Sequence, residues 1–200
     1  MTDFLIATNN THKVEEFKRI LKPLGINVLS SREAGVDLGD VEENGTSFKE
    51  NARIKAMSAY NISSMPCIAD DSGLCVDALG GAPGIFTARY GGEELTQKER
   101  NDYLLSNMKQ VETEKRSAEF VCSICCIINK DIIIEVQGIC SGSIAASPSG
   151  EDGFGYDPVF LYKDGRCFGE ISPEEKDSIS HRGIALRLLR DELNKRKDVL

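Results

Sequence analysis

Short apolar runs alternate with segments of helical periodicity in the N-terminal part of the chain. Residues 4–7 and 26–29 are short and mainly apolar, as in buried strands, and between them apolar residues recur at helical spacing over residues 14–24. Two longer apolar runs, residues 118–128 and 132–140, flank a short polar turn. These runs predict an antiparallel hairpin, which we interpret as scaffold.

Capping signals mark the expected helix starts. The pattern Ser47-x-x-Glu50 is typical of a capping box and predicts a helix through Ala59. Thr96 precedes a second predicted helix, and Ser172, followed by proline, precedes a third. The C-terminal part is expected to contain a hairpin formed by residues 159–162 and 166–168, and a last helix after residues 180–183.

Two adjacent carboxylates, Asp70 and Asp71, lie in the stretch where we expect the chemistry. An apolar run leads into them, and the Ser-Gly pair that follows predicts a turn before the next apolar run. Adjacent carboxylates repel each other and lose hydration when buried, a cost that a divalent cation would relieve. Oxygen-only ligands suit magnesium, and Glu42 and Glu43 are candidates for a second carboxylate arm. The alternative is a solvated acidic turn, but the glycine-rich segment 80–84 favours a ligand-binding loop.

A polar loop, residues 8–12, separates the first predicted strand from the first predicted helix. A strand, a loop and a helix start in this order point backbone N–H groups at an anion, and Lys13 adds a cation there. The loop lacks the glycine and lysine pattern of a P-loop. In the alternative interpretation, its Asn and Thr side chains cap the helix and Lys13 is solvated.

A second unusual loop spans residues 147–158. Gly153 and Gly155 flank Phe154, but Pro158 stands where a dinucleotide-binding fingerprint requires its third glycine, so that interpretation fails. An aromatic ring between glycines indicates a surface on which a ligand can stack. An ordinary glycine-rich loop with Phe154 packed inward is the alternative.

Composition and charge exclude several classes. The 200 residues suffice for one domain or two small lobes, and the net charge of -8 argues against non-specific nucleic-acid binding. No apolar run approaches the ~20 residues that span a bilayer, and the N-terminus does not resemble a signal peptide, so we expect a cytoplasmic protein. The seven cysteines include Cys122-x-x-Cys125, which lies in an apolar strand without a second pair. Buried reduced thiols are therefore favoured over a zinc site.

Several short motifs follow one another in a set order: residues 8–13, Glu42-Glu43 with Phe48 and 50–52, 69–74, 80–84, 88–90, 153–158 and 180–183. Each motif is short, but the set in this order and at this spacing is highly specific. Together they resemble the Ham1/RdgB family of inosine/xanthosine triphosphate pyrophosphatases over essentially the whole chain. In the first loop, where bacterial members often carry glycines, this chain has Asn9 and His12.

The resemblance implies an α/β fold: a long twisted mixed β-sheet flanked by helices, with two lobes and a nucleotide cleft between them, as one domain over residues 1–200. It implies a homodimer and a Mg²⁺-dependent reaction in which ITP, dITP or XTP and water give the monophosphate and pyrophosphate. Asp71 is the implied general base, and Glu42 and Asp71 are the implied metal ligands. The implied substrate contacts are Thr8, Asn9, Asn10, Thr11, His12, Lys13, Ser72, Phe154, Gly155, Tyr156, Asp157, Lys176, His181 and Arg182.

Two other functions remain open from the sequence. A non-catalytic nucleotide sensor would bind inosine nucleotides without consuming them, but the intact acidic residues argue against it. A magnesium-dependent nucleotide pyrophosphatase of broader base specificity would cleave ATP or TTP equally well. Phosphoryl transfer requires mainly positioning of the substrate and neutralisation of the phosphate charge. Lys13 and Lys176 are the candidate cations for that neutralisation.

Overall fold

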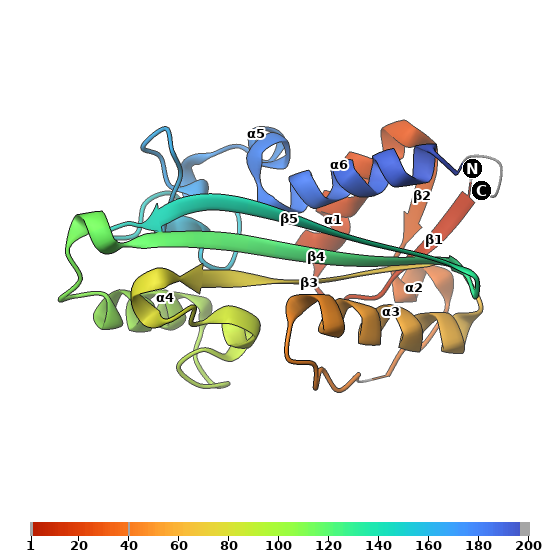
Figure 1. Ribbon diagram of the computed structural model, residues 1–200, viewed down its shortest axis with the longest axis horizontal. Helices are drawn as coiled ribbons and strands as arrows, with labels where there is room; N and C mark the ends of the chain where they lie inside the picture. The colour runs from red at the N-terminus through yellow and green to blue at the C-terminus, as the bar shows by residue number, and fades with distance from the viewer. Residues whose placement is uncertain (1, 40, 197–200) are drawn as a thin grey trace. The chain divides into compact units, whose positions relative to one another are not determined.

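The computed structural model describes residues 2–39 and 41–196 (Figure 1). Its strands are β1 Thr2–Ile6, β2 Ile26–Leu29, β3 Cys67–Val76, β4 Ser117–Asn129, β5 Ile132–Ile144 and β6 Phe160–Leu161. Its α-helices are α1 Thr11–Leu21, α2 Ser31–Ala34, α3 Phe48–Ser63, α4 Gln97–Asn107, α5 Pro173–Ile179 and α6 His181–Asn194. Short 3₁₀ segments are η1 Lys22–Leu24, η2 Asp77–Leu79, η3 Gly84–Arg89, η4 Thr113–Lys115, η5 Asp157–Val159 and η6 Phe168–Glu170.

The strands form one mixed sheet in the order β2-β1-β3-β4-β5-β6. β1 pairs in parallel with both β2 and β3, whereas β5 and β6 are antiparallel. Two residues join β4 to β5, and such a short connection can only link antiparallel neighbours. The predicted α/β fold with a mixed sheet and flanking helices, and the predicted long hairpin, are therefore confirmed.

The chain divides into two compact units. Unit 1 comprises the residues up to Asp71, Cys122–Gly138, and the residues from His181 onward, and unit 2 comprises Ser72–Val121 and Ile139–Ser180. β3, β4 and β5 contribute residues to both units.

Unit 1 covers both faces of its strands with helices (Figure 1). On one face, Phe4 and Ile6 of β1 pack with apolar residues of α1 and α6. On the other face, Leu5 and Ala7 pack with the alanines of α3. Alternate residues of a strand point to opposite faces, so a continuous apolar run such as residues 4–7 is buried on both sides.

Unit 2 has its own core. Residues of α4 pack there with the second half of β3 and with aromatic residues from β4, β6 and η6. The rings of Phe120, Phe160 and Phe168 form its centre, with centroids 4.6 to 6.0 Å apart.

The structure corrects three local predictions. The Ser-Gly pair after Asp71 does not turn the chain, because β3 continues without interruption from Cys67 to Val76. The predicted hairpin over residues 159–168 is reduced in the described chain to β6 and a single bridge between Leu161 and Cys167. The helix predicted to end at Ala59 continues to Ser63.

The capping predictions were right about the helix starts. Ser47 caps α3, and Thr96 forms a complete capping box with Glu99 on α4. Glu50, however, does not complete a box at α3, since its carboxylate accepts hydrogen bonds from the backbone N and the Oγ1 of Thr46.

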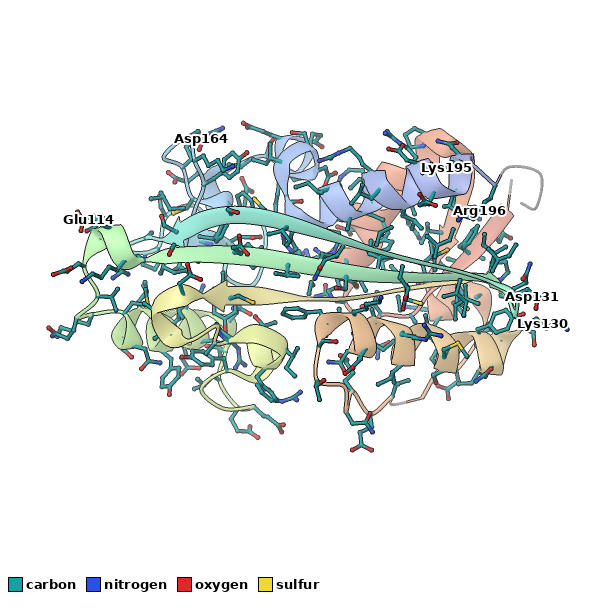
Figure 2. All side chains as sticks on the ribbon, viewed as in Figure 1. Glu114, Lys130, Asp131, Asp164, Lys195 and Arg196 are labelled. Atoms are coloured by element: carbon teal, nitrogen blue, oxygen red, sulfur yellow. The ribbon has the colours of Figure 1, made fainter. Side chains whose placement is uncertain are left out.

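Charged side chains lie at the chain turns and helix ends, such as Lys130 and Asp131 between β4 and β5, and Arg196 after α6 (Figure 2).

Among the described residues, no helix is both long and apolar enough to cross a bilayer.

Candidate active site

Asp70 is the centre of a buried charge cluster in unit 1. Its side chain is fully buried in β3, and its Oδ2 lies 3.0 Å from Lys13 Nζ and 3.0 Å from Arg182 Nη2. Arg182 Nε donates a further hydrogen bond to the same oxygen. Burial alone would raise the pKa of Asp70, but the positive charges of Lys13, Arg182 and Lys55 hold it well below its ordinary value. The carboxylate is therefore ionised at neutral pH.

Arg182 lies in the first turn of α6 and is almost completely buried. Besides its two bonds to Asp70, it donates from Nη1 to Glu16 Oε2 at 2.5 Å. At least three of its five N–H donors thus serve carboxylates within unit 1. A contact between Arg182 and a purine base stays a prediction. Glu16, on α1, is a member of this cluster that sequence reasoning missed.

The loop before α1 has features of both interpretations of its sequence, the helix cap and the anion-binding loop. The Oδ1 of Asn10 caps the helix by accepting from the backbone N of His12 and Lys13, and Thr8 Oγ1 accepts from Asn10 N. Lys13 is not simply solvated, because its ammonium pairs with Asp70. Asn9, Thr11 and His12 are exposed.

Asp71, the predicted general base, is held by two side chains of α3. Asn51 Nδ2 donates to Asp71 Oδ2 at 3.1 Å, and Lys55 Nζ lies 3.4 Å from Asp71 Oδ1. Burial raises the pKa of Asp71, while Lys55 and Asn51 oppose that rise. A carboxylate with a raised pKa accepts a proton more readily near neutral pH.

Asn51 and Lys55 were not predicted as site residues. They stand four positions apart, so they lie on the same face of α3, among the small residues Ala52, Ala56 and Ala59. Polar side chains at this spacing within a stripe of alanines are the signal that points to them. Asn51 is also anchored, since its Oδ1 accepts from Gly45 N at 2.9 Å.

Of the two candidate glutamates, the structure brings Glu43 to this cluster. Glu43 Oε2 accepts from Lys55 Nζ at 3.0 Å. Glu42 is exposed, and its side chain has no hydrogen bond or ion pair to any residue that the structure describes. Its role as metal ligand stays a prediction.

The glycine-flanked loop in unit 2 is organised by Asp157. Its Oδ2 accepts from Phe154 N at 2.7 Å and from Lys176 Nζ at 2.6 Å, and both Asp157 and Lys176 are buried. The ammonium lies 4.7 Å from the centroid of the Phe154 ring, which is half-buried. Gly153 has a φ of +77°, and a Cβ there would lie 2.2 Å from Asp157 Oδ2. Glycine is therefore required for this turn.

The same loop is anchored at two further points. Asn101 Nδ2 donates to the carbonyl of Gly155 at 3.2 Å, and the hydroxyl of Tyr156 donates to the carbonyl of Thr87 at 3.0 Å. Tyr156 belongs to the core of unit 2, and burial raises its pKa. Ser72 is half-buried in unit 2, and His181 is buried in unit 1.

The cysteines form no chelating pair at Cys122-x-x-Cys125. Cys122 packs on the α1 and α6 face of unit 1, whereas Cys125 packs on the α3 face. Side chains alternate between the two faces of a strand, so two residues three positions apart point to opposite faces. All seven cysteines are free in the structure and six of them are buried, and burial raises the pKa of Cys125 to about 12.

The fold and the charge cluster define an α/β protein with paired carboxylates, two lysines and a helix N-terminus gathered in one unit. The chain belongs to the Ham1 family, whose model matches residues 4–192. It is 45% identical to a dITP/XTP pyrophosphatase of Clostridium perfringens, covering 96% of this chain and 98% of that protein. A dITP/XTP pyrophosphatase of Escherichia coli is 42% identical, with 96% and 98% covered.

Solved structures agree with this assignment. A HAM1 protein from Coxiella burnetii superimposes with a TM-score of 0.88 at 38% identity, covering 98% of this chain and 100% of that one. The Ham1 protein of Staphylococcus aureus gives a TM-score of 0.85 at 37% identity, again with 98% and 100% covered.

Proposed function

We propose that this protein hydrolyses the deaminated purine nucleoside triphosphates ITP, dITP and XTP to the monophosphate and pyrophosphate. Relatives that match over nearly their whole length are named dITP/XTP pyrophosphatases. The observation that carries the proposal is the cluster in unit 1, where a buried carboxylate of raised pKa, Asp71, adjoins the ion pair between Asp70 and Lys13.

In the proposed reaction, Asp71 accepts a proton from the attacking water. The water oxygen bonds to the α-phosphorus, and the bond from the α-phosphorus to the oxygen that bridges the α- and β-phosphates breaks. The electron pair of that bond leaves with pyrophosphate. Asn51 keeps the Asp71 carboxylate oriented through its hydrogen bond to Oδ2. Lys13, in the first turn of α1, offers its charge and the helix N-terminus to the phosphates.

The donor set fits a divalent cation, and we propose Mg²⁺. Asp71 and Glu43 already share a cation, the Lys55 ammonium, and the buried Oδ1 of Asp70 accepts no hydrogen bond within the described residues. No three His, Cys, Asp or Glu side chains of the described chain converge tightly enough to hold a metal alone. Magnesium commonly binds one or two carboxylates and completes its shell with water and substrate phosphates. When bound, the ion would neutralise phosphate charge and acidify a water molecule.

We assign base recognition to Phe154, His181 and Arg182. The ring of Phe154 is fixed by Asp157 and Lys176 and would stack on a purine. His181 or Arg182 would donate a hydrogen bond to the 6-carbonyl oxygen of hypoxanthine or xanthine, whereas the 6-amino group of adenine is itself a donor and would leave these groups unpaired. The other predicted contacts, Gly155, Tyr156 and Ser72, remain proposals, as do the single functional domain and the homodimer.

A panel of triphosphates tests the function. We expect pyrophosphate release from ITP, dITP and XTP in the presence of Mg²⁺, and rates at least ~10²-fold lower from ATP, dATP, GTP and TTP. Comparable rates on dITP and dATP would favour the pyrophosphatase of broad base specificity. Binding of ITP without pyrophosphate release would favour the sensor.

Lys13→Ala is expected to raise KM for ITP at least ~10-fold, because phosphate loses a cation at a helix N-terminus. Steady-state kinetics at two salt concentrations measures this, and salt should weaken binding of the wild type more than that of the variant. Lys18→Ala is the matched control on α1, since Lys18 pairs with Glu33 at the surface and should leave KM unchanged. Unchanged kinetics in Lys13→Ala would show that Lys13 serves only Asp70.

Phe154→Ala is expected to lower kcat/KM by about tenfold for every purine triphosphate, because stacking does not distinguish purines. The ratio of kcat/KM in the variant to that in the wild type is measured for ITP, for XTP and for the residual activity on ATP. Phe86→Ala is the control, as Phe86 is an exposed ring of η3 in the same unit. A loss confined to one base would mean that Phe154 contributes to selectivity.

A further inference from the structure

Lys55 forms a bridge between two carboxylates of the candidate metal site. Its ammonium lies 3.0 Å from Glu43 Oε2 and 3.4 Å from Asp71 Oδ1. The Lys55 and Asp71 side chains are only 13% and 12% exposed, so water screens this contact weakly. All three residues belong to unit 1.

The bridge is held in place by the helix that carries Lys55. Asn51, one turn earlier on α3, fixes the other oxygen of Asp71 and is itself tied to the backbone of Gly45. The carboxylate of Asp71 is therefore held by two α3 side chains, and its Oδ1 faces the ammonium. A divalent cation that binds Asp71 and Glu43 uses oxygens that now contact Lys55.

We propose that Lys55 is the built-in counter-cation of the metal site, and that a divalent metal must displace its ammonium from Asp71 and Glu43 in order to bind. The inference rests on the proposed function, which places the metal at Asp71. According to this inference, the Lys55 ammonium has two effects on the metal site. The ammonium stabilises the buried Asp71 carboxylate and the more exposed Glu43 carboxylate before the metal binds, and it lowers the affinity of the free protein for the metal by repulsion between like charges.

Direct metal binding to the nucleotide-free protein tests the proposal. Mn²⁺ is titrated into wild type and Lys55→Met at pH 8, where carboxylates are ionised, and free Mn²⁺ is read by electron paramagnetic resonance. We expect Lys55→Met to bind Mn²⁺ at least ~10-fold more tightly, a change typical of coupling between neighbouring sites. Lys55→Arg keeps the charge and should show no such gain. Lys49→Met is the control, because Lys49 lies on the same helix and pairs with Glu135.

A second measurement uses the wild type alone, so that it does not depend on the folding of a variant. The rate at which an amine-reactive reagent modifies Lys55 is followed by mass spectrometry. Saturating Mg²⁺ should increase that rate at least ~3-fold, because displacement frees the ammonium from its two carboxylates. The modification rate of Lys49 should stay the same.

The outcomes separate the inference from the proposed function. If wild type binds Mn²⁺ and Lys55→Met binds it no more tightly, the counter-cation role is overturned while the metal site stands. An unchanged modification rate at saturating Mg²⁺ overturns it as well. If neither protein binds Mn²⁺, or if Asp71→Asn binds it as well as wild type, the proposed metal site fails and the inference fails with it.

Discussion

Asp71→Asn is expected to reduce pyrophosphate release from ITP by at least ~10²-fold, while the fold and nucleotide binding persist. An asparagine side chain keeps the shape of aspartate and still accepts the hydrogen bond from Asn51 Nδ2. It cannot accept a proton from water, and it is a poor ligand for a divalent cation. The expected loss corresponds to at least about 2.7 kcal/mol of transition-state stabilisation.

Single-turnover pyrophosphate release and ITP binding measure this result together. Asp77→Asn is the matched control, because Asp77 is an exposed aspartate that accepts a hydrogen bond from Ser117 in unit 2. It should retain wild-type activity. If Asp71→Asn keeps more than about a tenth of the wild-type rate, the general base lies elsewhere, and Glu42 and Glu43 are the next residues to test.

Arg182→Met is expected to lower the free energy of unfolding by about 3–5 kcal/mol at pH 8. The arginine is buried between Asp70 and Glu16, so its removal leaves two buried carboxylates without that charge. Removing Arg182 also raises the pKa of Asp70, because Arg182 is one of the cations that keep it low. A protonated Asp70 needs no cation, so the deficit should be largest where the carboxylate is ionised and should shrink once the pH falls far enough to protonate Asp70 in the variant.

Urea unfolding of both proteins at several pH values measures the deficit. Arg190→Met is the matched control, because Arg190 lies on the same helix and forms a partly exposed ion pair with Asp191. Its loss should cost less than about 1 kcal/mol. A deficit below that value in Arg182→Met at pH 8 would contradict the charge cluster. The ratio of ITP to ATP activity in the same variant tests whether Arg182 also selects the base: a flattened ratio supports that role.

Local patterns in the sequence were sufficient to predict many of the elements. The apolar run at residues 4–7 became β1, and Ser47, Thr96 and Ser172 cap helices as expected. The two long runs around residues 129–131 became β4 and β5. Such signals depend on neighbours in the chain, since helix caps and strand periodicity act within a few residues. The family motifs, which lie in order along the chain, also located the Asp70-Asp71 pair and Lys13.

Only the tertiary structure decided how that pair is accommodated. Its neighbours in sequence supply no basic residue, which favoured a solvated turn or a metal as the explanation for two adjacent carboxylates. The fold instead brings Lys13 and Arg182 to Asp70, and Asn51 and Lys55 to Asp71, so both carboxylates are buried in an uninterrupted strand. A buried charge is tolerated when partners compensate it, and partners that come from distant parts of the chain leave no local pattern. The sequence by itself thus determined β1, the hairpin of β4 and β5, the capped helix starts and the acidic pair, whereas packing determined the uninterrupted course of β3 and which cations and amides that pair would contact.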